Sequence, residues 1–151
     1  MKLITSLFVL IGLAGLFAYA TSLSPYGDSE ASGRVTVQVH DASGEMVIDA
    51  TYDFGEDDTL FDVLKRHHTI DYDARSGAIT GRVILGIDAV TTDFETDFLA
   101  ILITGRIHNR HGEALTVERQ FSSVGIDLLP LLDGNTYIFE HRDVGSFKAG
   151  D

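Results

Sequence analysis

The chain has 151 residues and no cysteine. This absence excludes thiol catalysis, disulfide bonds, iron–sulfur clusters and zinc sites with cysteine ligands. It also excludes the lipid-carrying cysteine that holds bacterial lipoproteins on a membrane. The protein therefore cannot be held on a membrane by that route.

Basic residues are scarce as well. The chain has 11 Lys and Arg against 23 Asp and Glu, which gives a net charge of −12. A field of this sign repels phosphate backbones and anionic lipid surfaces, so we expect no nucleic-acid partner. Solubility explains the acidity most simply, with a saline habitat or a cationic partner as alternatives.

The longest hydrophobic segment lies at the N-terminus and predicts export. Lys2 precedes an apolar run that is broken only by small or hydroxylated residues, and Ala18-Tyr19-Ala20 has the small residues that a signal peptidase requires. Residues 1–20 are therefore predicted to be a signal peptide. Because the run is at the short limit for spanning a bilayer, an uncleaved anchor over residues 3–19 is the alternative. Either interpretation makes the protein secreted or part of the cell envelope, and membrane contact would come only through this segment.

The residues after the leader divide into two parts. Residues 21–33 are small, polar and rich in turn formers, which predicts a flexible tether. Residues 34–147 are enough for one domain with a single core.

The hydrophobic pattern of this domain predicts an α+β fold with one helix packed on a mixed sheet, a β-grasp-like arrangement. Val35, Val37 and Val39 alternate with polar residues, as in a half-buried strand, and residues 48–54 provide the hairpin partner. A helix should follow Asp58 or Thr59, either of which can cap it, and Thr59 with Asp62 is close to a capping box. Later strands are expected around 79–87 (Ile79, Val83, Leu85 and Ile87 on one face), 99–104 (the central strand), 115–121, and 135–140 (Tyr137 and Phe139 on one face, Ile138 on the other).

The order of several short motifs resembles the transcobalamin-like C-terminal domain over residues 34–143. The motifs are Thr59-Leu60-Phe61-Asp62-Val63-Leu64, Gly81 with a strand ending at Gly86-Ile87, Thr104-Gly105, Gly125-Ile126, and Asp133-Gly134-Asn135 before the last strand. Three positions depart from the family pattern: Phe98 stands where the family has Trp, Thr104 replaces Asn, and Asn135 replaces Asp.

The resemblance implies a non-catalytic ligand-binding module. In the cobalamin carriers this domain covers one side of the corrin ring, and a separate helical barrel holds the other side. The present sequence includes no such barrel, so we expect weaker binding unless a partner completes the site. The resemblance implies contacts from the segment that enters the central strand, so the predicted ligand-binding residues are Phe94, Asp97, Phe98, Thr104 and Gly105. The simpler alternative is that Phe98 begins a core strand and Phe94 packs under the loop.

No pattern predicts catalysis, a resident cofactor or a metal. His108, His111 and Glu113 lie in one polar loop, and Asp93, Glu95 and Asp97 alternate, but neither group has established metal-ligand spacing. Solvated loops explain both groups. His40 and His141 are expected to face solvent. The predicted function is therefore binding of a small molecule, with cobalamin suggested by the resemblance, or of another exported protein in a cell-surface interaction or adhesion role. An exported hydrolase is a third hypothesis, which requires a paired carboxylate or histidine in a cleft.

Overall fold

The computed structural model of the chain describes residues 26–73, 80–109 and 111–145. The predicted signal or anchor segment and residues 21–25 of the predicted tether lie outside these ranges. Within them, no helix is both long enough and apolar enough to cross a bilayer. The described residues form an α+β domain in which strands predominate and one α-helix, α2, packs into the core.

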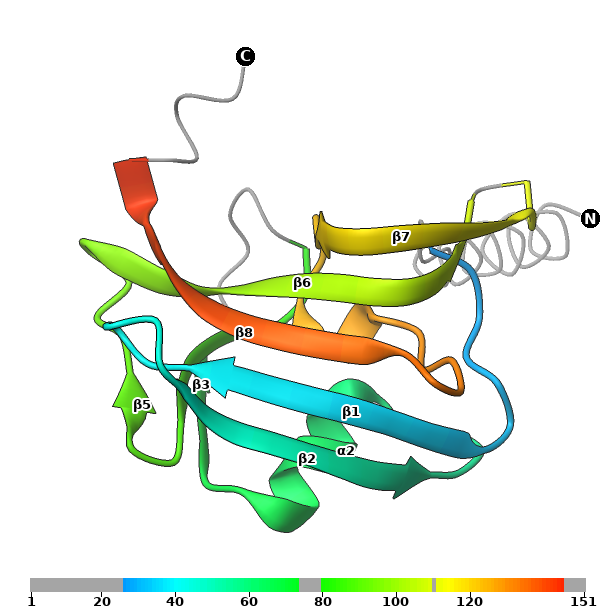
Figure 1. The fold of residues 1–151 in the computed structure, drawn as a ribbon, viewed down its shortest axis with the longest axis horizontal. Helices are drawn as coiled ribbons and strands as arrows, with labels where there is room; N and C mark the ends of the chain where they lie inside the picture. The colour runs from blue at the N-terminus through cyan, green and yellow to red at the C-terminus, as the bar shows by residue number, and fades with distance from the viewer. Residues whose placement is uncertain (1–25, 74–79, 110, 146–151) are drawn as a thin grey trace, which may run out of the picture.

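Five strands form a mixed sheet in the order β2-β1-β8-β6-β7 (Figure 1). Neighbouring strands are antiparallel except for β1 and β8, which are parallel. The first and last strands of the described domain therefore lie side by side in the sheet. The strands are β1 (Gly33–His40), β2 (Met46–Phe54), β6 (Asp97–His108), β7 (Ala114–Phe121) and β8 (Thr136–Asp143).

The alternating patterns of the first and last strands are confirmed. Val35, Val37 and Val39 have no exposed surface and lie in the main core. Tyr137 and Phe139 join the same core, whereas Ile138 packs on the opposite face of the sheet. Period-two alternation was sufficient here because both strands have one clearly apolar face.

The strand that was predicted to be central is the neighbour of the middle strand. Residues 99–104 are part of β6, which lies between β8 and β7, and the middle strand of the sheet is β8. The run is apolar on both faces because β6 contributes to cores on the two sides of the sheet.

Helix α2 (Leu60–His67) begins where it was predicted. The Thr59 hydroxyl accepts a hydrogen bond from the Asp62 amide, and the Asp62 carboxylate accepts one from the Thr59 amide. These two bonds satisfy amide groups that the first helical turn leaves unpaired. The helix buries Leu60, Phe61, Val63 and Leu64 in the same core as the inner residues of the sheet.

A second, three-stranded sheet was not predicted. It has the order β3-β4-β5, with β3 (Ile70–Asp73), β4 (Val83–Ile87) and β5 (Val90–Thr91). A register shift leaves Leu85 opposite no residue of β3, so Ile84 and Ile87 both reach the core. Val83 alternates with Ile84 and is not among the residues of that core, so the prediction that Val83, Leu85 and Ile87 share one face was wrong at both Val83 and Leu85. Ile79 lies outside the described residues.

Residues 26–32 belong to the folded domain, which corrects this part of the predicted flexible tether. Tyr26 is buried, and its hydroxyl lies 3.2 Å from the hydroxyl of Ser123. The Ser29 hydroxyl accepts a hydrogen bond from the Leu131 amide, and the Glu30 amide donates one to the Leu131 carbonyl. This segment reads as a tether in sequence because its partners lie about one hundred residues away.

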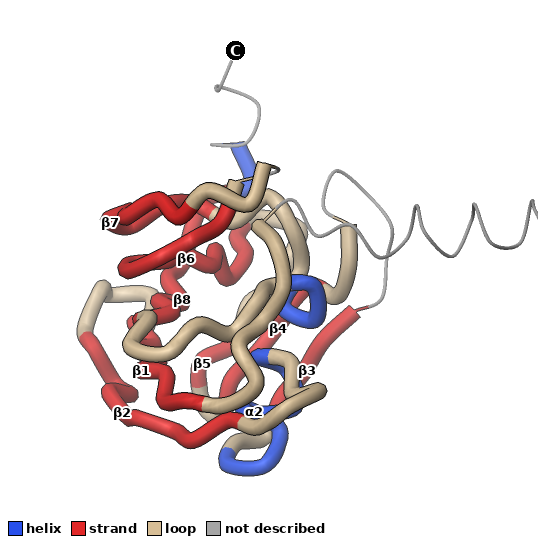
Figure 2. The backbone as a smooth tube through the Cα atoms, turned by 90° about the vertical axis from the view of Figure 1, so that its right-hand side faces the viewer, coloured by secondary structure: helices blue, strands red, loops and turns tan. Residues whose placement is uncertain are grey.

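Helix α2, the short 3-10 helix η1 (Ile126–Leu128) and the three-stranded sheet all lie on one side of the five-stranded sheet (Figure 2). We call this side the inner face. None of these elements lies over the opposite side, which we call the outer face (Figure 2). The outer face is therefore where side chains of the sheet itself meet their surroundings.

Candidate functional site

The outer face has a small apolar cluster of its own. Phe98, Ala100 and Leu102 of β6 pack against Ile138 of β8, and each of the four is at most 5% exposed. Partly buried side chains from three other segments cover the cluster, namely Phe94, Phe121 and Val144. The ligand-binding prediction for this end of β6 can therefore be tested residue by residue.

Of the two predicted aromatic contacts, Phe94 keeps accessible surface and Phe98 does not. The two rings meet edge to face with centroids 6.5 Å apart. Phe98 is 2% exposed and begins the β6 contribution to the outer cluster, as the simpler alternative proposed. Phe94 is half-buried and has a left-handed backbone with φ of 60°, which is uncommon for an aromatic residue. Phe94 is thus the aromatic residue of this pair that a ligand can reach.

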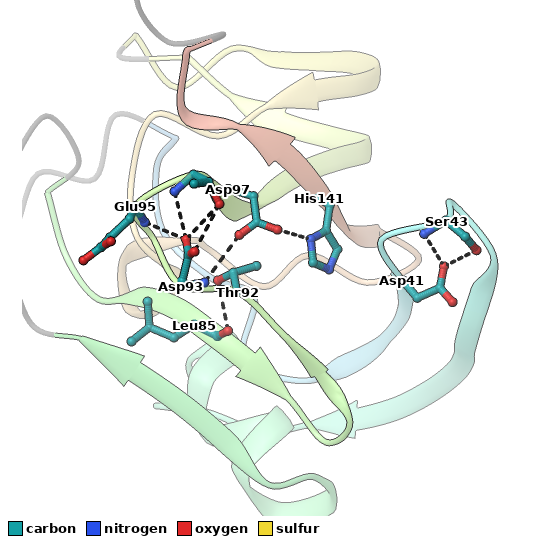
Figure 3. Close-up of polar contacts among 9 residues, drawn as sticks. Asp41, Ser43, Leu85, Thr92, Asp93, Glu95, Asp97 and His141 are labelled. Carbon is teal, nitrogen blue, oxygen red and sulfur yellow. Dashed lines mark hydrogen bonds and ion pairs between the residues drawn. The ribbon is translucent and has the colours of Figure 1, made fainter.

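The loop that carries Phe94 is held by Asp93 (Figure 3). One Asp93 carboxylate oxygen accepts hydrogen bonds from the amides of Glu95 and Thr96, both at 2.8 Å. The bond from the Thr96 amide, followed by that from Glu95, holds the pKa of Asp93 below its usual value. This carboxylate is directed into its own loop, so it does not act with Glu95 and Asp97 as a calcium ligand in this conformation.

Asp97 on β6 and His141 on β8 have the geometry of an ion pair. The Nδ1 atom of His141 lies 2.7 Å from an Asp97 carboxylate oxygen, and the histidine side chain is 13% exposed (Figure 3). The expectation that His141 faces solvent was wrong. The two residues are diagonal neighbours in the antiparallel register, a relationship that the sequence alone does not reveal.

His141 also lines an open depression of about 530 Å³ beside the β1–β2 turn. Asp41, in that turn, accepts hydrogen bonds from the amide and hydroxyl of Ser43, and the hydroxyl bond is the main cause of its lowered pKa. The depression is lined by His40, Asp41, Ala42, Ser43, Gly44, Arg119, Glu140, His141 and Arg142.

Within the depression, Glu140 is paired with two arginines. One carboxylate oxygen accepts a hydrogen bond from Arg119, and the other accepts bonds from Nε and Nη2 of Arg142. The glutamate side chain is 15% exposed, while each arginine side chain is nearly half exposed. We call these three residues the arginine clamp.

Thr104 and Gly105 do not join this site. They lie toward the other end of β6, on the order of 25 Å from Asp97 along an extended strand. The Thr104 hydroxyl accepts a hydrogen bond from the Arg119 amide, and Gly105 lies tightly against Asn135. Both residues therefore have structural roles in the sheet.

The alternative metal candidates are also separated by the fold. In residues 26–73, 80–109 and 111–145, no group of three or more histidines and carboxylates is arranged to hold an ion. In the β6–β7 turn, the Asn109 side chain accepts hydrogen bonds from the amides of His111 and Glu113 and donates one to the Glu113 carboxylate. These bonds account for the polar residues of the turn.

A second histidine network was not foreseen. His68, at the end of α2, lies 2.5 Å from the Tyr52 hydroxyl through Nε2 and 2.6 Å from the Asp88 carboxylate through Nδ1. Burial, reinforced by the charge of Asp88, raises the pKa of Tyr52. The hydrogen bond from His68, followed by that from the Thr69 amide, lowers the pKa of Asp88. The network connects β2, α2 and the β4–β5 turn.

Acid should loosen the Phe94 loop through Asp93. Because the folded-state pKa of Asp93 is lowered, its stabilising contribution is complete above the unfolded-state value of about 3.9 and is lost as the pH falls below that value. We expect the Thr96 amide resonance to move in this acidic range in an NMR titration. In Asp93→Asn, which keeps an acceptor oxygen but does not titrate, this movement should disappear; its persistence would contradict the assignment.

Comparison with models of known protein families gave no match, and no curated protein matched either. Among solved structures, the chain is similar to a candidate metal-binding protein from Ruminococcus gnavus, with 19% identity and a TM-score of 0.47. That alignment covers 74% of this chain and 97% of the other. The function of this chain is therefore inferred from its own residues.

Proposed function

We propose that this chain is an exported, non-catalytic binding module of the transcobalamin-like C-terminal kind. Its ligand would be a small molecule with a planar face, such as a corrinoid, bound at the end of the five-stranded sheet where β6 begins. The observation that carries the proposal is that Phe94 and the Asp97–His141 pair lie at the same end of the five-stranded sheet, next to an open depression. Phe94 packs on the outer cluster, whereas His141 lies opposite Leu99, a residue of the inner core, so the pair borders the inner side of this end. Asp97 links the aromatic loop to that depression because its partner, His141, lines it.

The arrangement of the strands supports the family resemblance. A mixed sheet with its first and last strands parallel in the interior, together with one packed helix, is consistent with the β-grasp-like arrangement expected from the sequence. Two pairs of motif residues that are distant in sequence also meet in space. A Cβ atom on Gly125 would lie 2.5 Å from the Arg82 amide nitrogen, directly after Gly81, and one on Gly105 would lie 2.2 Å from the Asn135 side-chain oxygen. The glycines of the motif therefore allow close approaches on which the fold depends.

The His141–Asp97 pair has chemistry suited to a metal-containing ligand. A histidine whose Nδ1 atom is bonded to a carboxylate is fixed in orientation and presents Nε2, the arrangement found behind many metal-ligating imidazoles. Phe94 would contact the apolar part of the same ligand. Because one face of the ligand would remain uncovered, binding should be weak unless a second exported protein completes the site.

The polar networks favour binding over catalysis. A tyrosine nucleophile needs a lowered pKa, but that of Tyr52 is raised, so the phenol stays protonated beside His68. Around the other pair, the Ser43 hydroxyl donates to Asp41 instead of approaching His141. Neither histidine–carboxylate pair therefore activates a nucleophile in the part of the chain that the structure describes.

Titration of the full-length chain with cobalamin tests the proposal. We expect a shift in the visible spectrum and measurable calorimetric heat, with about tenfold weaker binding in Phe94→Ala. His141→Gln should remove the spectral shift that depends on imidazole coordination. Tyr72→Ala removes an exposed aromatic residue of β3 and should leave binding unchanged. Absence of both heat and spectral change at high micromolar cobalamin would overturn the corrinoid assignment.

A cell-surface protein-interaction role is the second candidate, and strand β2 favours it. This strand lies at the edge of the five-stranded sheet, and Met46 and Val47 on it are 46% and 48% exposed. Edge strands offer backbone groups to which a partner strand can add. Recovery of one stoichiometric envelope protein, lost in Val47→Pro, would support this role.

Mass measurement of the mature N-terminus would test the proposed export and cleavage after Ala20.

A further inference from the structure

The arginine clamp concentrates positive charge in an acidic protein. The chain carries a net charge of −12, yet Arg119 and Arg142 both converge on one carboxylate, that of Glu140. The three side chains together have one positive charge in excess. Glu140 is largely buried beneath the two guanidinium groups, which remain nearly half exposed. The excess charge therefore lies on the solvent side of the pair.

Most of the hydrogen-bond donors of the clamp are not used by Glu140. An arginine side chain has five N–H donors in a planar fork, and the bonds to Glu140 use Nη2 of Arg119 with Nε and Nη2 of Arg142. Neither side chain makes a further hydrogen bond to the described residues, and both line the depression. Guanidinium forks of this kind match the two oxygens of a carboxylate.

The other polar groups around the depression do not cancel the preference of the arginines for a carboxylate. His40 and His141 add two imidazoles to its lining. Asp41 is the opposing charge, but its Oδ1 atom is occupied by the amides of Ser43 and Glu45 and by the Ser43 hydroxyl. Glu140 is therefore the carboxylate that faces the arginines directly.

We propose that the arginine clamp is a binding site for a carboxylate-bearing small ligand, with Glu140 occupying the guanidinium groups when no ligand is present. A single carboxylate fits better than a phosphate because repulsion by the acidic protein grows with the charge of the ligand. The depression, with a volume of about 530 Å³, has room for an organic group attached to that carboxylate. This site goes beyond the proposed ring-binding role and does not depend on it.

If Glu140 competes with the ligand for the two arginines, removing Glu140 and removing an arginine should have opposite effects on affinity. Removing the charge of Glu140 should strengthen ligand binding, because the two arginines then lose the carboxylate that they already hold. Removing either arginine should weaken binding, because a charge-assisted and bidentate contact is lost. A purely structural ion-pair network would respond to both changes with a loss of stability and no gain in affinity.

Benzoate and benzamide are suitable probes for NMR titration of the full-length chain, since they differ in the carboxylate. We expect benzoate, but not benzamide, to shift the amide resonances of residues 41–44 and 140–142. Glu140→Gln should bind benzoate at least about threefold more tightly, and Arg119→Gln or Arg142→Gln about tenfold more weakly. Arg66→Gln is the matched control, because it makes the same change in charge at the Asp58 pair on α2 and should leave the affinity unchanged.

The outcomes distinguish the possible sources of the carboxylate, and they distinguish this proposal from the ring-binding proposal. An acetylated dipeptide with a free C-terminus that binds more tightly than benzoate would identify a peptide terminus as the carboxylate source, whereas the reverse order would identify a small organic acid. Equal responses to benzoate and benzamide, tighter binding of inorganic phosphate, or no gain in Glu140→Gln with its dispersed NMR spectrum intact would overturn the proposal. Cobalamin binding tests the Phe94 site independently, so either site can fail alone.

Discussion

Replacing Gly105 with alanine should destabilise the protein by about 3 kcal/mol or more, the largest effect that we expect from adding one methyl group. Gly105 has φ of +129°, a conformation that side chains of L-residues rarely adopt. A Cβ atom at this position would also lie 2.2 Å from the side-chain oxygen of Asn135. Backbone strain and steric overlap therefore act at the same residue.

Asn135 cannot easily move aside to make room. It is 2% exposed, and its side chain pairs with both backbone groups of Arg106, accepting from the amide and donating to the carbonyl at 2.7 Å. Displacing it would leave two backbone groups unpaired in a part-buried position, at a cost of about 1–3 kcal/mol for each. The glycine and the asparagine are thus parts of one structural device.

Urea unfolding measures this effect, with Gly44→Ala as the control. Gly44 also has a positive φ of +85°, but nothing lies within 4 Å of its Cβ position, so this change should cost only the backbone strain of about 1 kcal/mol. Equal losses in the two variants would contradict the role of Asn135. In Gly105→Ala combined with Asn135→Ala, the two losses should be less than additive, because the overlap is removed.

Leu64→Ala should destabilise the fold by about 2–5 kcal/mol. Leu64 has no exposed surface and lies with Val37, Ile101 and Phe139 in the core between α2 and the sheet. Removing it should leave a cavity that the surrounding strands can close only in part. The effect tests the packing of α2 against the inner face, on which the family resemblance depends.

Leu115→Ala provides the same chemical change at an exposed position. Leu115 lies on the edge strand β7 and is 45% exposed, so the expected loss is within about 0.5 kcal/mol. Both variants can be compared by the midpoint of urea unfolding at constant slope. If Leu64→Ala were no more destabilising than Leu115→Ala, the helix would not pack as described.

Features that depend on neighbouring residues could be predicted from the sequence. Strand β1 followed from the alternation of Val35, Val37 and Val39, and α2 followed from its capping box and apolar face. Features that depend on distant pairing could not. Strand β5 has two residues and no periodicity of its own, and the bulge at Leu85 exists only in relation to β3. The second sheet was missed for these reasons.

The residues of the candidate site divide in the same way, into those set by neighbours in sequence and those set by distant pairing. Phe94, Asp97 and Phe98 were identified together because they are close in sequence, whereas Thr104 and Gly105 were added through the resemblance and lie elsewhere along β6. His141 was expected to face solvent because its partner, Asp97, lies 44 residues away. The arginine clamp joins β7 to β8 across the intervening strand β6, and each of its members alone reads as an ordinary exposed charge.

The central claim is that ligands reach this protein at the end of the five-stranded sheet where β6 begins. NMR mapping of the full-length chain during a cobalamin titration tests that claim most directly. We predict that the resonances that shift will be those of residues 92–98 together with His141 and its neighbours on β8. Shifts confined to α2 and the three-stranded sheet, or no shifts at saturating cobalamin, would contradict it.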